Sequence, residues 1–183
     1  MTSTLSEIRP DLFPKAHFPQ IPIFPPNPTL NPDAKLKSRI TSLLMHGQVW
    51  NRQDPTGCLI SEKLDGFRAF WDGSALYSKH GNLLEVPLGF TDSFPRDICL
   101  DGELWAGYDG FSKLSSILRT TSNLQISSPD EKYEAWKEVQ YCVFDAPMHP
   151  GPYPERHQFA SKSIEGVPIE FTRYFPRDVC LDG

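Results

Sequence analysis

Cysteine and positive charge are both in short supply in this sequence. The 183 residues include only four cysteines, and no two are spaced as C-x-x-C. The sequence therefore predicts neither a zinc site nor a compact disulfide scaffold. The formal net charge is -5, which excludes a protein that binds nucleic acid with its whole surface, because such binding depends on clustered Lys and Arg. Any contact with nucleic acid must be local.

Long hydrophobic runs are also missing. No stretch approaches 18 uninterrupted apolar residues, and the N-terminus lacks the basic and then apolar layout of a secretory signal. We therefore expect an intracellular protein, in the nucleus or a mitochondrion if it is eukaryotic and in the cytoplasm if it is bacterial. An apolar content of 39% in a chain of this length is enough for one domain with a real core.

Proline is abundant at the N-terminus. Eight prolines lie between positions 10 and 32. Each removes a backbone donor and pushes the preceding residue toward extended geometry, so we expect residues 1–33 to form an extended segment. An amphipathic helix is predicted to begin at Asp33 as its N-cap and to end at Gly47. The apolar residues that repeat at helical spacing within it are Leu36, Ile40, Leu43 and Leu44.

Short β segments follow this helix. Residues 58–62, 67–71 and 75–78 read as strands, and the turn signal Asp72-Gly73 joins the last two. Farther along, the pattern indicates a strand at 98–105, a helix at 111–119, a polar loop near 127–130 and a strand at 140–145. This order predicts an α+β domain with an antiparallel sheet over residues 34–165.

Residues 166–183 form an atypical tail that repeats an earlier segment. Ten of the thirteen residues of 171–183 are identical to those of 90–102. Stacked repeat folds need at least three units to build a continuous core, so two copies do not indicate such a fold. We interpret the second copy as a duplicated exon or an error in the gene structure.

The most specific signal is the motif K-x-D-G-x-R, formed by Lys63, Asp65, Gly66 and Arg68. Four fixed residues of these types occur by chance at roughly one in 10⁵ starting points. Three further segments follow in order, LYSKHGNLL at 76–84, LDGELWAG at 100–107 and YCVFDAP at 141–147. Together they resemble the nucleotidyl-transfer motifs of ATP-dependent DNA ligases, most closely the small ligases of bacterial and mitochondrial type. The resemblance covers about half of the chain, residues 59–147.

This resemblance implies the ATP-grasp-like adenylation domain of a ligase that acts as a monomer on nicked double-stranded DNA. In that family the motif lysine, here Lys63, attacks the α-phosphate of ATP, holds AMP and passes it to the 5′-phosphate at a nick. The resemblance implies catalytic roles for Asp65 and Arg68 as well, with ATP and Mg²⁺ as cofactors. A free lysine with a pKa near 10.4 is neutral in only about one molecule in 2,500 at pH 7. Lys79 and His80, with Arg68, are expected to form a positive pocket that favours the neutral amine.

Further binding residues come from the same resemblance. Glu103 meets the ribose or the metal, and Asp65 with Glu103 supplies the carboxylates that Mg²⁺ prefers. Phe144 stacks on adenine, and Glu62 is assigned to the adenine end of the site. Lys79 stands where the family commonly has arginine, so it keeps the charge and loses the bidentate fork. From the residues alone, Lys79 is equally a surface lysine, Glu103 part of an acidic turn and Phe144 a core residue.

The later motifs of a complete ligase are not found. Glu165-Gly166 begins like E-G-x-x-x-K/R, but Glu170 occupies the basic position, and neither a later K-x-K motif nor an OB-fold domain is recognisable. We therefore expect an incomplete adenylation domain with impaired nick sealing. Two alternatives remain open. One is an inert nucleotide-binding product of a truncated gene, and the other is an RNA ligase or an mRNA-capping guanylyltransferase, because these enzymes share K-x-D-G-x-R.

Overall fold

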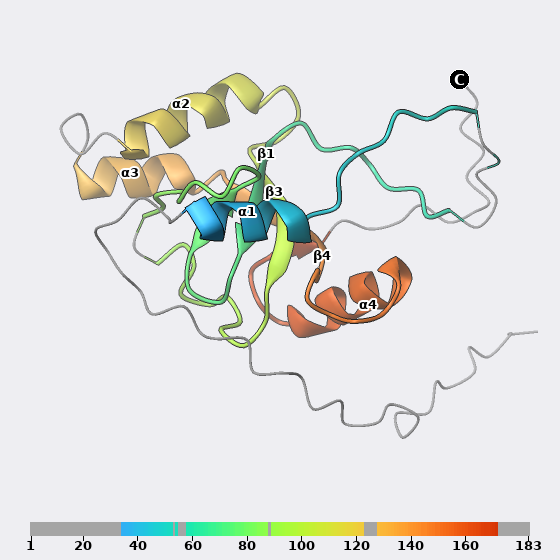
Figure 1. Cartoon of the computed structure of the whole chain (residues 1–183). Helices are drawn as coiled ribbons and strands as arrows, with labels where there is room; N and C mark the ends of the chain where they lie inside the picture. Colours follow the sequence, from blue (N-terminus) through green and yellow to red (C-terminus); the bar gives the residue numbers. More distant parts are fainter. Residues whose placement is uncertain (1–33, 53, 55–57, 88, 123–127, 172–183) are drawn as a thin grey trace, which may run out of the picture.

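The computed structural model describes residues 34–52, 54, 58–87, 89–122 and 128–171 (Figure 1). The N-terminal segment expected to be extended and the second copy of the repeat, from residue 172 onward, lie outside the described residues. None of the described helices is long and apolar enough to cross a membrane.

The described elements confirm the predicted α+β class. In chain order they are α1 (Ala34–Leu43), β1 (Phe67–Trp71), β2 (Leu76–Ser78), β3 (Leu100–Trp105), α2 (Phe111–Ser122), α3 (Pro129–Trp136), β4 (Gln140–Asp145), α4 (Tyr153–Ser163) and β5 (Glu170–Phe171). The sheet has the order β2-β1-β3-β4-β5. Its first four strands are antiparallel, as expected, and β5 joins the edge parallel to β4.

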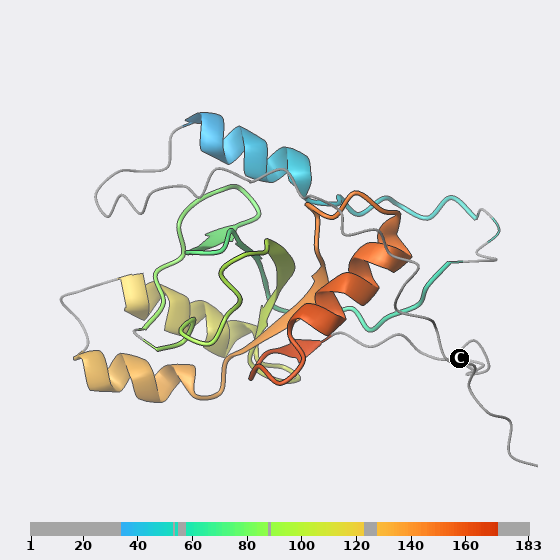
Figure 2. The same cartoon turned by 90° about the horizontal axis from the view of Figure 1, so that it is seen from below.

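One face of the sheet carries the main hydrophobic core. Alternate residues of a strand point to the same face, so Ala69 and Trp71 of β1 lie beside Leu100 and Leu104 of β3. Leu114 of α2 packs onto this face and is fully buried. Figure 2 shows α2 and α3 on this side of the sheet and α1 on the other, with α4 beside β4.

The opposite face is partly apolar and partly polar. Ile40 and Leu44 are buried against Phe70, Tyr77 and Cys99. The α1 region therefore covers β1 and β2 at one end of this face. The rest of the face, over β1, β3 and β4, carries charged side chains, and we call it the polar face; its charged residues are Arg68, Asp101, Glu103 and Asp145.

Tyr141 fixes the spacing of the central strands. Its hydroxyl lies 3.0 Å from the carbonyl oxygen of Ala69 and 3.1 Å from that of Leu100, and it donates to these acceptors. The ring crosses β3 at Gly102, where an added Cβ would lie 2.7 Å from the Tyr141 ring. A glycine inside a strand often marks such a close approach. The glycine of the L-D-G-E segment is thus explained by packing.

Three of the predicted boundaries are wrong. Helix α1 ends at Leu43 and does not continue to Gly47, and residues 58–62 form no strand beyond a single bridge at Ser61. The predicted loop near 127–130 instead contains the start of α3. Ser128 caps that helix and exchanges hydrogen bonds with Glu131. Serine and proline suggested a loop, but Ser-Pro-x-Glu is also the pattern of a helix N-terminus.

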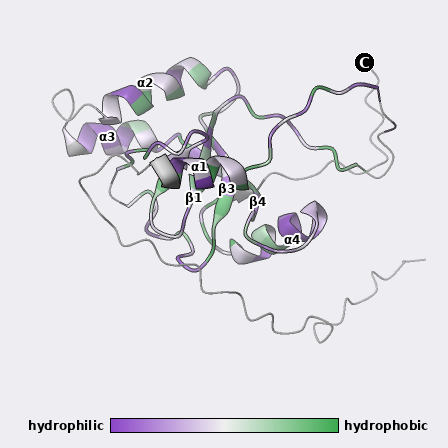
Figure 3. Cartoon of the chain, in the orientation of Figure 1, coloured by the Kyte–Doolittle hydropathy of each residue, from purple (hydrophilic) through white to green (hydrophobic). Residues whose placement is uncertain are grey.

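Two helices, α3 and α4, were not predicted. Figure 3 shows α3 in mainly hydrophilic colours, so its sequence has no clear apolar stripe for a periodicity argument. In α4 the helix starts after Pro152, and Pro154 lies in its first turn. Proline is tolerated at this end of a helix because the N–H it lacks has no partner there.

Candidate active site

The K-x-D-G-x-R segment enters the sheet where β1 approaches β3 closely. A Cβ added to Gly66 would lie 2.1 Å from the carbonyl oxygen of Leu104, so a side chain cannot be accommodated there without moving the backbone. The N–H of Gly66 donates a hydrogen bond to the carboxylate of Glu103. This contact brings the exposed Lys63 near Glu103, at the edge of the polar face.

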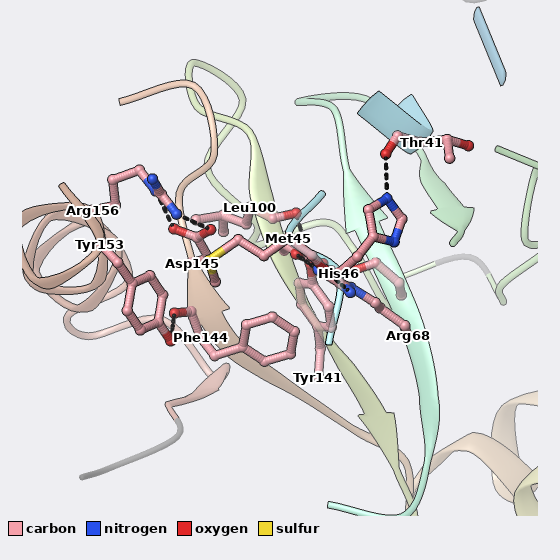
Figure 4. Close-up of polar contacts among 12 residues, drawn as sticks. Thr41, Met45, His46, Arg68, Leu100, Tyr141, Phe144, Asp145, Tyr153 and Arg156 are labelled. Carbon is pink, nitrogen blue, oxygen red and sulfur yellow. Dashed lines mark hydrogen bonds and ion pairs between the residues drawn. The ribbon is translucent and has the colours of Figure 1, made fainter. Parts of the chain in front are cut away.

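Arg68 is held in place by a buried carboxylate. Its Nε lies 3.1 Å from Oδ1 of Asp101 and its Nη2 lies 2.5 Å from Oδ2, while Nη1 donates to the carbonyl oxygen of Met45 (Figure 4). Burial raises the pKa of Asp101 to about 6, and Arg68 opposes that rise. Asp101 is therefore largely ionised at pH 7, and all three nitrogens of Arg68 have partners.

Glu103 faces Arg68 across the β1–β3 pair. It is half-buried. Burial raises its pKa to about 7, although the Gly66 N–H and the charges of Lys63 and Arg68 act in the opposite direction. A carboxyl with this pKa changes its charge near neutrality, so a nearby cation would favour its ionised form.

Phe144 lies on the polar face by strand alternation with Cys142, and a β-bulge brings Asp145 to that face as well. Asp101 pairs with Asp145, but Gly102 pairs with Val143, which leaves Phe144 as the extra residue on β4. Bulges re-aim side chains and are frequent beside active sites. The half-buried ring of Phe144 lies 5.5 Å from the Arg68 guanidinium carbon, measured to the ring centroid. The structure thus gathers Lys63, Arg68, Glu103 and Phe144 around one surface.

A second ion pair lies beside the first. Arg156 of α4 approaches the fully buried Asp145 with two nitrogens, at 2.8 Å and 3.0 Å (Figure 4). Tyr153, also of α4, donates its hydroxyl to the carbonyl oxygen of Phe144 at 3.1 Å. Sequence reasoning missed Tyr153 and Arg156 because they lie outside the motifs. Asp101 and Asp145 lie within the motif segments, and their position there was the signal that could have identified them as site residues.

The remaining predicted residues lie farther out. Lys79 and His80 are exposed in the turn after β2, and Asp65 is exposed before β1. Glu62 is exposed too. The side chain of Tyr108 forms a hydrogen bond with Glu62, and this bond raises the pKa of Tyr108. Among the described residues, no three His, Cys, Asp or Glu side chains are arranged to hold a metal. An ion held by Glu103 and Asp65 would therefore need ligands from phosphate and water, as is usual for Mg²⁺.

A cavity of about 370 Å³ lies on the other side of the sheet. Five of its twelve lining residues are aromatic, namely Phe90, Phe94, Tyr133, Trp136 and Tyr141. None of the predicted site residues lines it. The motif residues and their charges therefore place the candidate site on the polar face, which is an open surface.

Comparison with known proteins relates the chain to ligases. No family model matches it. It is 32% identical over 114 residues to a DNA ligase of Haemophilus influenzae, covering 62% of this chain and 38% of that protein. It is 26% identical to a structure solved in a structure-function analysis of Lig E DNA ligases, with a TM-score of 0.54, covering 72% of this chain and 52% of that one. The chain thus spans between about two fifths and half of the length of these relatives. The resemblance to DNA ligases that the motifs indicated is confirmed in both sequence and fold.

Proposed function

We propose that this chain performs the adenylation chemistry of an ATP-dependent DNA ligase, with Lys63 as the nucleophile. The observation that carries the proposal is the gathering of Lys63, Arg68, Glu103 and Phe144 at one surface of the sheet. These residues come from three separate motifs and from strands that are distant in sequence. Their order along the chain matches that of the ligase motifs, and DNA ligases are related to the chain in sequence and fold.

The first step forms a bond between Nζ of Lys63 and the α-phosphorus of ATP. The bond from that phosphorus to the bridging oxygen breaks, and pyrophosphate leaves. The ammonium group must first lose a proton, and a lysine pKa of about 7 to 8 would recover about 3 to 4 kcal/mol relative to a free lysine.

The other residues bind the nucleotide. Phe144 has one ring face toward Arg68, so adenine would stack on the other face. Glu62 is assigned to the adenine end, and Lys79 with His80 to the phosphates. Glu103 and Asp65 would hold Mg²⁺, which neutralises phosphate charge when bound. The lysyl adenylate would then pass AMP to the 5′-phosphate of nicked DNA, the step that serves DNA replication, recombination and repair.

Covalent labelling tests the proposal. The purified chain is incubated with Mg²⁺ and with ATP, GTP or NAD⁺ carrying label in the nucleotidyl phosphate, and the modified residue is located by mass spectrometry. We expect acid-labile label from ATP on Lys63, and its loss in Lys63→Arg and Lys63→Met. Lys137→Arg is the matched control, because Lys137 is an exposed residue that pairs with Glu134 after α3. That variant should label like the parent.

Each other outcome rejects a specific part of the proposal. Label from GTP alone would indicate a capping-type guanylyltransferase, and label from NAD⁺ alone a different cofactor. AMP on another lysine would make the assignment of Lys63 wrong. Absence of label from all three nucleotides would favour the inert alternative.

A further inference from the structure

The bulged residue of β4 is held by a helix outside the ligase-like motifs. A residue in a bulge leaves the strand ladder, and a buried backbone acceptor needs a partner. The carbonyl oxygen of Phe144 accepts a hydrogen bond from the hydroxyl of Tyr153 at 3.1 Å. The backbone that carries the Phe144 ring is thus fixed from α4.

The next residue is held from the same helix. Asp145 is fully buried and receives two hydrogen bonds from Arg156, at 2.8 Å and 3.0 Å. Tyr153 and Arg156 are three residues apart, so they lie on the same face of α4. The guanidinium carbon of Arg156 lies 5.5 Å from the centroid of the Tyr153 ring. The two side chains form one support, and they hold two consecutive residues of β4.

This support also compensates one of two negative charges that lie side by side. Asp145 pairs directly with Asp101 across β3 and β4, and like charges in that position repel each other. Arg156 compensates Asp145 while Arg68 compensates Asp101. The Arg68 guanidinium also lies over the Phe144 ring, while the Arg156–Asp145 pair holds the residue next to it.

We propose that Tyr153 and Arg156 are positioning residues that hold Phe144 in the orientation that stacks on adenine. The proposal rests on the proposed function, because it assigns the Phe144 ring to the base. Tyr153 and Arg156 act only through β4, and neither touches the nucleotide. Their loss should weaken binding of the adenine end and leave binding of the phosphate end unchanged.

Tyr153→Phe is the sharpest test, because it removes one hydroxyl and keeps the ring beside Arg156. A hydrogen bond of this kind contributes about 0.5 to 1.5 kcal/mol, so we expect the Kd for ATP to rise by about two- to tenfold. The Kd for pyrophosphate, measured by calorimetry, should stay the same. Tyr133→Phe is the matched control, because Tyr133 lies on α3 and is exposed. It should change neither constant.

A double-mutant cycle shows whether Tyr153 acts through Phe144. Effects of residues that depend on each other are not additive, so Tyr153→Phe should have no further effect on ATP binding in a Phe144→Leu chain. Arg156→Lys keeps the charge and loses the two-pronged contact. We expect it to weaken ATP binding at least as much as Tyr153→Phe, with a lower melting temperature because Asp145 is buried.

Two results would overturn the inference while leaving the proposed function intact. One is an equal loss of ATP and pyrophosphate binding in Tyr153→Phe, which indicates a general structural role. The other is an undiminished effect of Tyr153→Phe in the Phe144→Leu background. Failure of the unchanged chain to bind ATP would instead refute the proposed function, and the inference with it.

Discussion

At Glu103, burial and the neighbouring positive charges shift the pKa of the carboxyl group in opposite directions. Its pKa is raised to about 7 from an ordinary value of 4.5, and burial is the largest cause. Between these two pH values the folded state therefore binds more protons than the unfolded state. Stability falls as pH rises wherever this is so. The wild-type chain is thus expected to lose stability from about pH 4.5 to pH 7 through Glu103.

Glu103→Gln should remove this dependence, because glutamine does not ionise. We expect the melting temperature of the variant, relative to that of the parent, to increase from pH 4.5 to pH 7 and then to level off. Melting curves in buffers with EDTA measure this without bound metal. Asp101 is present in both chains, so its own titration cancels to first order. A difference that is constant with pH, or that falls, would show that Glu103 does not titrate as described.

At the scale of the elements, the close approach of β1 and β3 determines where Lys63 lies. Gly66 faces the carbonyl of Leu104 and the side chain of Glu103. Because the contact at 2.1 Å is with backbone, the two strands must separate to admit a methyl group. Such a separation would also weaken the hydrogen bond from Gly66 to Glu103.

Gly66→Ala should therefore destabilise the fold by about 1 to 3 kcal/mol, the usual cost of overpacking. Urea unfolding measures the change. Gly47→Ala is the matched control, because an added Cβ at Gly47 meets nothing within 4 Å. It should be neutral within about 0.5 kcal/mol. Equal stability of the two variants would mean that the approach of β1 to β3 is looser than the structure shows.

At the scale of the whole molecule, net charge limits what these 183 residues can do with DNA. The chain carries a net charge of -5 and spans 38% of the Haemophilus influenzae ligase and 52% of the solved ligase chain. Tight binding to a duplex needs several phosphate contacts from Lys and Arg. Among the predicted site residues that the structure describes, the exposed basic ones are Lys63, Lys79 and His80.

We predict that the 183 residues alone form the lysyl adenylate but do not seal nicks over multiple turnovers. Sealing requires in-line attack by the 3′-hydroxyl on an adenylated 5′-phosphate, and a misplacement of about 1 Å can cost two orders of magnitude in rate. A gel assay with a 5′-labelled nicked duplex, ATP and Mg²⁺ at low salt tests this, with an intact ligase as the positive control. Repeated turnover by the chain would contradict the argument.

Local sequence determined the elements whose signals are strong. The predicted bounds of the strands at 67–71 and 140–145 agree with β1 and β4, because apolar runs bounded by turns fix such strands locally. The helix predicted at 111–119 continues to Ser122. The α4 helix was not predicted, although the prolines at its N-terminus lie where a helix tolerates them.

The sequence by itself determined the order of the motifs, and with it the relation to DNA ligases. It also named Lys63, Arg68, Glu103 and Phe144 as candidates. Only the tertiary structure decided the bulge at Phe144, the pairing of Arg68 with Asp101 and that of Arg156 with Asp145. Register between distant strands depends on which faces pack together. A buried carboxylate likewise needs a partner brought from elsewhere in the fold, and no local pattern specifies which one.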